Sequence, residues 1–345
     1  MNFRYMTSRV PSPYAEPLGE IARQLGIKLQ SQMPLSRYTA ARIGGPAEFL
    51  IEVNSSSTLA QLMPLIWENE IPYTLLGGGS NVLISDEGLV GLVIINRARG
   101  RGRVRFDLSG HPALVWADAG VNLAHLARQA AAQGLSGLEW ASGIPGTLGG
   151  AVVNNAGAFD GDMAGNLVMV TILHRRWDNN QFCPVQEQWT VEEMEYRYRS
   201  SRLKQNAIQA IVLSALLRLE RRDPITIKSK MEDFAQRRRK TQPPGASLGS
   251  MFKNPSGDFA GRLIDAAGLK GLTIGGAMIS PLHANFFINM GNATAKDVWQ
   301  LIQAARQAVA AKFGIDLELE IQPLGNFAEP STPSVIKSSL EVQNE

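Results

Sequence analysis

The chain has 345 residues, of which 44% are hydrophobic and 19% are charged, so it is too long for one hydrophobic core and too apolar to be disordered over most of its length. The net charge of +3 is too small to indicate a nucleic-acid-binding protein, and the single cysteine, Cys183, excludes an intrachain disulfide and a cysteine metal cluster. The densest apolar stretch, 208–217, is too short to cross a bilayer, and residues 1–18 lack the apolar core of a signal peptide, so we expect a cytoplasmic protein without a membrane or nucleic-acid partner.

The first part of the chain is predicted to be β-rich, with helices between the strands. An N-terminal extension, 1–30, is expected to contain an amphipathic helix over 18–29. A run of three serines is a good source of a cap for a second helix over 58–67. Strands are expected at 49–53, 73–76 and 92–95. This β-α-β pattern predicts a first subdomain over 31–96.

The middle of the chain, 97–222, is predicted to form a second subdomain of the same domain. Asn122 is expected to cap an alanine-rich helix that ends near Gly134. Further strands are expected at 114–119, 169–174 and 211–219. The polar break at 221–224 predicts a boundary, so that one domain extends over 31–222.

The last part of the chain, 223–327, is predicted to be a separate C-terminal domain. Thr294, with Asp297 three residues later, has the spacing of a capping box and predicts a helix that reaches Phe313. Other helices are expected at 228–240 and 259–267, and strands at 286–290 and 317–322. The Ser/Pro/Glu-rich residues 328–345 are predicted to be a disordered tail.

Two glycine-rich stretches give the strongest chemical signal. Residues 77–81 read Gly-Gly-Gly-Ser-Asn after a predicted strand, and three glycines let successive backbone N–H groups form one phosphate-binding concavity. Residues 142–157 contain five glycines, which are unfavourable unless the backbone approaches another group closely. Neither stretch matches the dinucleotide-binding or P-loop pattern. Together they predict a clamp for a phosphate-bearing cofactor such as a flavin dinucleotide, with two packed turns as the alternative.

Three further segments each have two interpretations. Arg199, in Tyr-Arg-Ser-Ser, could hold a carboxylate by two parallel hydrogen bonds, although the residues alone favour a surface strand end. Ser250 precedes an aromatic residue, a lysine and an asparagine, and it belongs either to an anion-binding site or to a polar loop. Alternation in the last predicted strand puts Glu318 and Glu320 on one face, where both could meet solvent.

The remaining charged groups give weaker signals. Of the four histidines only His283, beside a predicted strand, is a candidate site residue, and their spacing does not predict a metal site. The basic run Arg237–Lys240 is interpreted as the end of a helix, where positive charge complements the helix dipole. The alternating arginines within 97–105 are interpreted as a solvated loop.

In combination, these segments resemble the UDP-N-acetylenolpyruvoylglucosamine reductase (MurB) family of bacterial peptidoglycan precursor synthesis. The resemblance extends from about Leu35 to Asn326. The segments that match are 42–47, 76–82, 137–157, 198–201, 249–255, 260–271, 283–289 and 320–321. The spacing is similar to that of the shorter form of the family, which lacks an inserted tyrosine loop.

The resemblance implies an α+β fold with a vanillyl-alcohol-oxidase-type FAD-binding domain in two α/β subdomains, followed by a C-terminal α/β substrate-binding domain. It implies FAD and NADPH as cofactors, and the FAD would be non-covalent because neither glycine-rich stretch holds a histidine or cysteine that could attach it. The residues implied to bind FAD are Arg42, Gly44, Gly77, Gly78, Gly79, Ser80, Asn81, Val82, Ser142, Gly143, Ile144, Pro145, Gly146, Thr147, Gly149, Gly150 and Ala151.

The resemblance also implies a reaction. FAD reduced by NADPH would pass hydride from N5 to C3 of UDP-N-acetylglucosamine enolpyruvate. Arg199 and Glu320 would stabilise the charge that develops, and Ser250 would protonate C2 to give UDP-N-acetylmuramate. The residues implied to bind the substrate are Tyr198, Arg199, Lys253, Asn254 and His283. The expected protein is a monomer; the alternatives are another FAD oxidoreductase of the same fold and a non-catalytic nucleotide-binding protein.

Overall fold

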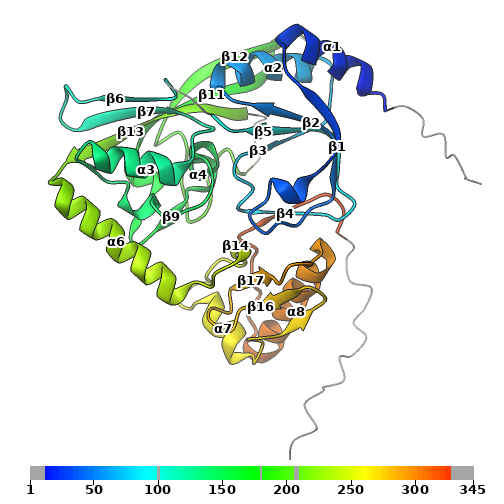
Figure 1. Ribbon diagram of the computed structural model, residues 1–345, viewed down its shortest axis with the longest axis vertical. Helices are drawn as coiled ribbons and strands as arrows, with labels where there is room; N and C mark the ends of the chain where they lie inside the picture. The colour runs from blue at the N-terminus through cyan, green and yellow to red at the C-terminus, as the bar shows by residue number, and fades with distance from the viewer. Residues whose placement is uncertain (1–11, 99–101, 179–180, 206–209, 328–345) are drawn as a thin grey trace, which may run out of the picture.

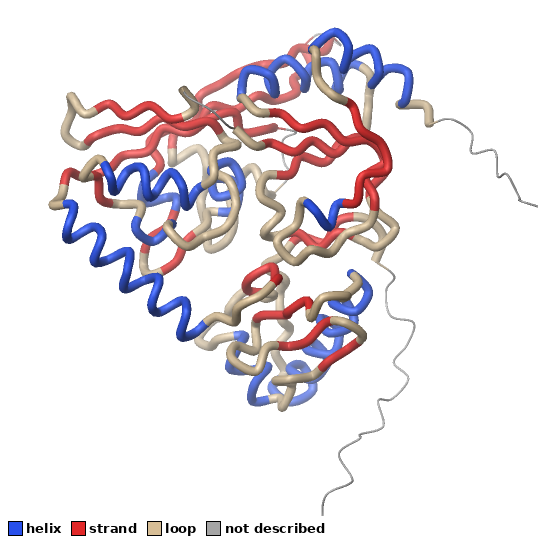
Figure 2. Tube along the Cα trace, viewed as in Figure 1, coloured by secondary structure: helices blue, strands red, loops and turns tan. Residues whose placement is uncertain are grey.

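The computed structural model describes residues 12–98, 102–178, 181–205 and 210–327, which fold into three packed units (Figure 1). Two units are built on larger sheets with helices packed against them, and a smaller C-terminal unit lies below them (Figure 2). The predicted tail, 328–345, and the start of the predicted extension, 1–11, lie outside the described residues. Within the described residues, no helix has the length and hydropathy needed to cross a membrane.

The first unit is a four-stranded sheet in which three strands run parallel and the edge strand β1 runs antiparallel to its neighbour. Its strands, in spatial order, are β1 (Leu29–Pro34), β2 (Pro46–Val53), β5 (Leu89–Asn96) and β3 (Tyr73–Leu76). Helices α1 (Ala15–Leu25) and α2 (Ser56–Glu68) bury apolar side chains such as Leu18 and Leu62 against this sheet. The Ser55 side chain accepts a hydrogen bond from the backbone N–H of Thr58 and caps α2, which confirms the serine cap.

The predicted helix over 18–29 is wrong at its C-terminal end. α1 ends at Leu25 because Gly26 adopts a left-handed conformation, with φ of +62°, that closes the helix. The chain then enters β1, whose central residues are exposed polar side chains. No apolar alternation marks this edge strand, which is why the sequence did not predict it.

The second unit is an antiparallel sheet. Its strands, in spatial order, are β12 (Gln181–Thr190), β11 (Leu167–Asp178), β13 (Ala210–Arg221), β7 (Ala113–Asp118) and β6 (Val104–Asp107), with β8 (Leu135–Ser136) beside the end of β13. The other elements of this unit are α3 (Leu123–Ala132), η2 (Glu139–Ala141), α4 (Leu148–Asn154), the hairpin β9 (Gly157–Ala158) and β10 (Gly161–Asp162), and α5 (Met163–Asn166). Asn122 caps α3, as predicted. Helix α2 packs between the two sheets, since its apolar face shares one core cluster with Leu173, Ile211 and Leu213 of the second sheet.

Helix α6 (Pro224–Thr241) begins at the predicted break after β13, where Asp223 caps it. It contacts α3, β8 and η2 of the second unit, and it runs along that unit towards the C-terminal unit (Figure 1). The helix is therefore a bridge between the two units.

The C-terminal unit is a small antiparallel sheet packed against two helices. Its strands, in spatial order, are β14 (Ala246–Ser250), β17 (Phe286–Asn289), β16 (Ala277–Ile279) and β15 (Thr273–Ile274), and its helices are α7 (Ala260–Ala266) and α8 (Ala295–Phe313). The capping box at Thr294 and Asp297 is present, which confirms the predicted start of α8. Core residues of α8, Leu301 and Ile302 among them, are fully buried.

Several contacts fix the C-terminal unit on the first unit. The Asp86 carboxylate accepts hydrogen bonds from the backbone N–H groups of Ala295 (2.8 Å) and Lys296 (2.9 Å) at the start of α8. After the short helix η1 (Leu35–Arg37), the carbonyl of Ala41 accepts from Asn289 Nδ2 at 2.8 Å. The last strand, β18 (Gln322–Leu324), pairs in parallel with β4 (Val82–Ile84) of the first unit.

The predicted strand over 317–322 is confirmed only in part, since β18 begins at its last residue. Before it, Leu319 forms a single antiparallel bridge with Phe252, in which the N–H of Glu320 donates to the carbonyl of Met251 at 2.9 Å. The Glu318 side chain is 71% exposed and the Glu320 side chain is 15% exposed. The two glutamates thus differ in exposure, although the positive charge of Lys253 acts on both carboxylates.

Buried Asn285 holds the segment that follows β14. Its Oδ1 accepts from the N–H of Phe252 at 2.9 Å, and its Nδ2 donates to the carbonyl of the same residue at 2.8 Å. The carbonyl of Asn285 accepts from Met251 N–H at 2.8 Å. One side chain thus satisfies both backbone groups of Phe252, which is itself fully buried.

Asn285→Ala is expected to lower the free energy of unfolding by roughly 2–4 kcal/mol, because two buried backbone groups lose their partners. Denaturant unfolding of the variant and the wild type measures the difference. Asn69→Ala, which removes an exposed amide, is the matched control and should change the value by less than about 0.5 kcal/mol. Equal effects of the two substitutions would contradict the structural role of Asn285.

Candidate active site

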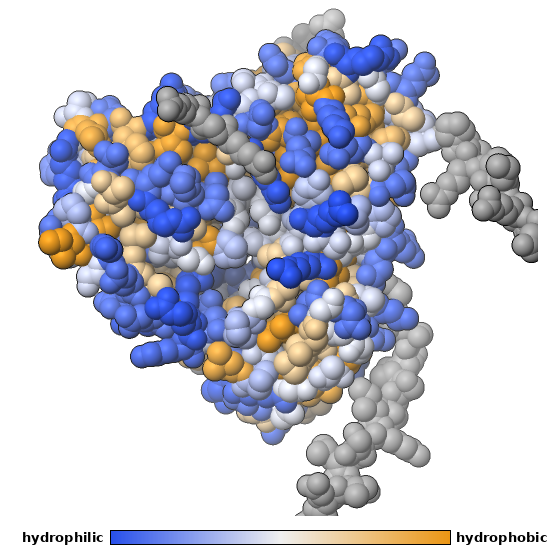
Figure 3. All heavy atoms as spheres, in the orientation of Figure 1, coloured by the Kyte–Doolittle hydropathy of each residue, from blue (hydrophilic) through white to orange (hydrophobic). Residues whose placement is uncertain are grey.

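A cavity of about 710 Å³ lies where the three units meet. Figure 3 shows the surface hollowed between the two upper units and the C-terminal unit. Its wall is formed by the loop between β3 and β4, the residues leading into α4, and β14. This volume lies within the range of about 300–1,000 Å³ that is typical of pockets for cofactors and substrates.

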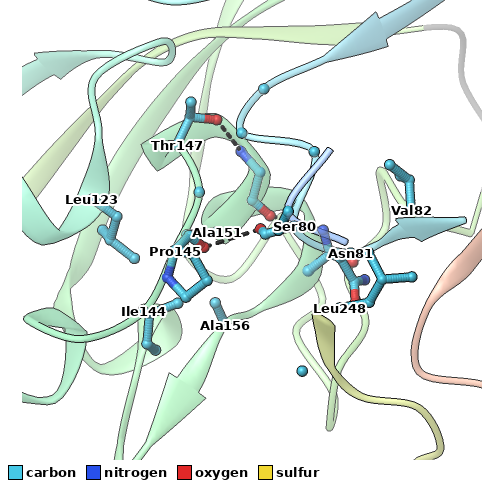
Figure 4. Close-up of a pocket in the computed structure, with 18 of the residues that line it drawn as sticks. Ser80, Asn81, Val82, Leu123, Ile144, Pro145, Thr147, Ala151, Ala156 and Leu248 are labelled. Atoms are coloured by element: carbon cyan, nitrogen blue, oxygen red, sulfur yellow. Dashed lines mark hydrogen bonds between the residues drawn. The ribbon is translucent and has the colours of Figure 1, made fainter. Parts of the chain in front are cut away.

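The two glycine-rich stretches pack directly against each other along this cavity. A methyl group at Gly78 would lie 2.6 Å from the Cα of Gly146, and one at Gly77 would lie 2.2 Å from Thr147 Oγ1. Ser80 Oγ donates to the carbonyl of Pro145 at 3.0 Å, as Figure 4 shows. The packed-turn interpretation therefore explains Gly77 and Gly78, and the same backbone also lines the cavity.

The second stretch is not a loop throughout, because α4 begins within it. Thr147 caps this helix by accepting a hydrogen bond from the N–H of Gly150. A methyl group at Gly149 would lie 2.9 Å from the Cβ of Ala119, so the glycine lets α4 pack closely on the end of β7. The density of glycine concealed this helix from sequence analysis, since glycine disfavours helices.

Most residues predicted to bind the cofactor line the cavity. They are Gly77, Gly78, Gly79, Ser80, Asn81, Val82, Gly143, Ile144, Pro145, Gly146, Thr147, Gly149, Gly150 and Ala151. Three predicted residues do not line it. Arg42 is exposed, Gly44 packs near Ile84, and Ser142 Oγ donates to the carbonyl of Glu139.

Arg199, Ser250 and Glu320 all line the same cavity, although they come from three distant segments of the chain. Arg199 Nε lies 2.7 Å from Glu320 Oε1, but its N–H does not point along this line, so the contact is an ion pair rather than an aligned hydrogen bond. Arg199 Nη1 donates to the carbonyl of Gly157 at 3.0 Å. Both side chains are largely buried, at 24% and 15% exposure. The arginine that the residues alone placed at the surface thus lies in the site.

Burial raises the pKa of Glu320, and the positive charges of Arg199, Lys204 and Lys253 counteract the shift only in part. Desolvation disfavours the ionised form, whereas nearby cations favour it. Glu318 makes an ion pair with Lys253 at the rim. The cluster of these five side chains has three cations and two carboxylates, and this excess of positive charge suits an anionic ligand.

Two basic residues of the cavity were missed in the sequence. Lys204 lies five residues after Arg199, and burial lowers its pKa. Arg238 belongs to the basic end of α6, and its Cδ would lie 2.8 Å from a methyl group at Gly143. Arg238 lies in the last turn of α6, as the basic run predicted, but its side chain also lines the cavity. The only signal in the sequence was the helical period, which places Arg238 four residues after Phe234 on the packed side of α6.

The other predicted substrate residues lie outside the main cavity. Tyr198, Lys253 and Asn254 line a second hollow of about 230 Å³, and Glu318 lines it too. His283 lines neither hollow. Its ring lies 4.8 Å from that of Phe286, and burial lowers its pKa.

The cavity has features that suit a flavin dinucleotide. Asn96 Oδ1 is buried in its wall without a hydrogen-bond partner, so an acceptor is left for a ligand. Backbone N–H groups of two contacting loops, together with Arg238, can bind phosphate, and Arg199 can bind another anionic group. Among the described residues, no three His, Cys, Asp or Glu side chains are grouped as metal ligands would be.

Comparison with known proteins gives matches over most of the chain. Residues 47–174 match the family of FAD binding domains, and residues 240–324 match the C-terminal domain of UDP-N-acetylenolpyruvoylglucosamine reductase. The chain is 42% identical over 303 residues to the UDP-N-acetylenolpyruvoylglucosamine reductase of Chloroflexus aurantiacus, covering 86% of this chain and 98% of that protein. It is 42% identical over 319 residues to UDP-N-acetylenolpyruvoylglucosamine reductase 2 of Symbiobacterium thermophilum, covering 91% of this chain and 98% of that protein.

A solved structure agrees with these matches. The crystal structure of UDP-N-acetylenolpyruvylglucosamine reductase from Thermus caldophilus aligns with a TM-score of 0.68 and 38% identity, over 87% of this chain and 99% of that chain. These findings confirm the predicted family and the predicted α+β fold with an FAD-binding domain and a C-terminal domain. The division of the chain at 222 stays a prediction.

Gly78→Ala is expected to weaken FAD binding, because the added methyl group forces the two glycine-rich stretches apart. Overpacking of about 1–3 kcal/mol, if bound FAD has to bear it, corresponds to a roughly fivefold to 150-fold rise in the dissociation constant. Titration of the flavin-free protein with FAD measures this dissociation constant. Gly19→Ala is the control, since no atom lies within 4 Å of a methyl group there. Unchanged FAD binding by Gly78→Ala would contradict the clamp.

Glu320→Gln tests the raised pKa of the buried carboxyl. A folded-state pKa above the ordinary value of 4.5 means that ionisation destabilises the folded protein, and this penalty disappears as the pH falls towards 4.5. The free energy of unfolding of the variant, minus that of the wild type, should therefore rise as the pH increases from 4.5 to the raised pKa. Above the raised pKa the difference should stay constant. Denaturant unfolding across pH, with Glu318→Gln as the control, measures it. A difference that falls with rising pH would contradict burial as the dominant effect.

Proposed function

Since the chain belongs to the UDP-N-acetylenolpyruvoylglucosamine reductase family of oxidoreductases, we propose that it reduces UDP-N-acetylglucosamine enolpyruvate to UDP-N-acetylmuramate with NADPH. The observation that carries the proposal is the convergence of Arg199, Ser250 and Glu320 on the cavity that the two glycine-rich stretches line. The reaction belongs to the synthesis of peptidoglycan precursors.

The residues proposed to hold FAD are those of the two glycine-rich stretches, together with Asn96. When bound, FAD supplies the redox chemistry, in which hydride from NADPH is passed to C3 of the enolpyruvyl group. Among the cavity-lining residues that the structure describes, none is a histidine or cysteine, which supports non-covalent binding. The protein's own part is orientation, charge stabilisation and proton transfer.

Arg199 is proposed to bind the enolpyruvyl carboxylate and to stabilise the negative charge that spreads into it as C3 is reduced. A guanidinium fixed before the reaction begins stabilises developing charge without reorganisation. The ion pair with Glu320 and the hydrogen bond to the Gly157 carbonyl fix this guanidinium, while its place in the cavity wall leaves it accessible to a ligand.

Ser250 is proposed to donate the proton that C2 receives. A serine hydroxyl is a weak acid, but a carbanion-like carbon is a strong base, so the transfer is reasonable when the two atoms are held together. Ser250 is the last residue of β14, and the bonds around Asn285 fix the residues that follow it. This scaffold holds the hydroxyl at the cavity.

The nucleotide part of the substrate is proposed to extend towards the second hollow. Lys253 and Asn254 line it, and Tyr198 presents an exposed ring there. The positive charge of Lys253 at this hollow suits the diphosphate. His283 lies outside both hollows, and no part of the proposal rests on it.

Ser250→Ala is expected to leave reduction of the flavin by NADPH unchanged and to slow its reoxidation by the enolpyruvyl sugar nucleotide by about 100-fold or more, because only the second half-reaction needs the proton. Anaerobic stopped-flow absorbance separates the two halves. Ser256→Ala, an exposed serine in the same loop, is the control. Equal slowing of both half-reactions would overturn the role of Ser250, and a protein that NADPH does not bleach would overturn the function.

A further inference from the structure

Lys204 is a half-buried cation in the cavity wall that the proposed reaction does not use. Burying an ammonium group is unfavourable unless specific contacts compensate it. The backbone around it is fixed: Lys204 N–H donates to the carbonyl of Ser201 at 3.0 Å, and the fully buried Ser201 donates from its hydroxyl to the carbonyl of Val153. The lysine is therefore anchored to the end of α4, and its position is not that of a mobile surface side chain.

The ammonium group of Lys204 has a specific partner. Its Nζ donates to the backbone carbonyl of Arg199 at 3.1 Å. Such a charge-assisted hydrogen bond is stronger than one between neutral groups, more so in a partly buried site. It acts on the backbone of Arg199, whereas Glu320 and Gly157 contact the guanidinium.

The backbone of Arg199 needs such support. Its φ is +54°, in the left-handed region that residues other than glycine rarely adopt. A conformation of this kind persists only where the surroundings fix it, and it is common at functional sites. Hydrogen bonds between Arg197 and Ser200, at 3.1 Å in both directions, close the turn that contains Arg199, and the Lys204 ammonium adds a contact to the Arg199 carbonyl itself. If that carbonyl were released, the peptide after Arg199 could rotate within the turn, and the guanidinium would shift from its place beside Glu320.

We propose that Lys204 is a positioning residue: its ammonium group holds the Arg199 carbonyl, and thereby keeps the guanidinium in the orientation that receives the substrate carboxylate. This inference rests on the proposed function, because it needs Arg199 to be the carboxylate ligand. Lys204 itself need not touch the substrate.

The test compares two ligands of the oxidised holoenzyme by calorimetry. One is UDP-N-acetylglucosamine enolpyruvate, and the other is UDP-N-acetylglucosamine, which lacks the carboxylate. Lys204→Met should weaken binding of the first by about tenfold to hundredfold, as a small misplacement of a binding group can, and leave binding of the second unchanged. Lys228→Met, an exposed lysine on α6, is the control and should change neither.

A double-mutant cycle separates positioning from a direct contact. If Lys204 acts only through Arg199, then Lys204→Met should have no further effect on either ligand in the Arg199→Ala background. If Lys204→Met does not fold, Lys204→Gln gives a second measurement, because it keeps a polar group in this half-buried place. It is also expected to weaken binding of the ligand with the carboxylate and not of the other.

The outcomes distinguish the two proposals. If Arg199→Ala discriminates between the ligands but neither Lys204 variant does, or if Lys204→Met has the same effect in both backgrounds, the positioning role is overturned and the proposed function stands. If Arg199→Ala itself does not discriminate, the carboxylate-binding role of Arg199 in the proposed function is overturned, and the inference fails with it.

Discussion

The ion pair between Arg199 and Glu320 is the contact on which the site depends. It joins the second unit to the residues that lead into β18, and it lies in the wall of the cavity between the units. The raised pKa of Glu320 shows that the local charges do not fully offset the unfavourable burial of the carboxyl. A partly buried pair of this kind contributes little to stability by itself, so its value lies in the orientation of two charged groups.

This pair forms only because several other contacts position the backbone of Glu320. The pairing of β4 with β18 brings residues 320–324 to the first glycine-rich stretch, where Asn81 Nδ2 donates to the carbonyl of Glu320 at 3.2 Å. Asn285 fixes the neighbouring loop, and the N–H of Glu320 donates to Met251 in that loop. Hydrogen bonds between the first unit and the C-terminal unit, and others within the C-terminal unit, thus fix the backbone from which Glu320 projects into the cavity.

The fold could be predicted from the sequence where local signals decide structure. The caps at Asn122 and Thr294 fixed the starts of two helices, and the strand over 73–76 was predicted with its observed bounds. The edge strands β1 and β12 and the glycine-containing helix α4 were not found, since packing and not propensity stabilises them. Most of the strand predicted over 317–322 is reduced to one bridge between Leu319 and Phe252, because this segment pairs with the loop after β14 and not with a longer strand.

The sequence by itself determined that two glycine-rich stretches are present, and its motifs determined the family, because these features depend on residue identity and order. Only the tertiary structure decided that Gly77 and Gly78 are required by contact between the two stretches, that Arg238 faces inward, and that Lys204 holds the backbone of Arg199. Local propensity cannot fix these relations, because each depends on the distance between segments that only the packing of the three units brings together.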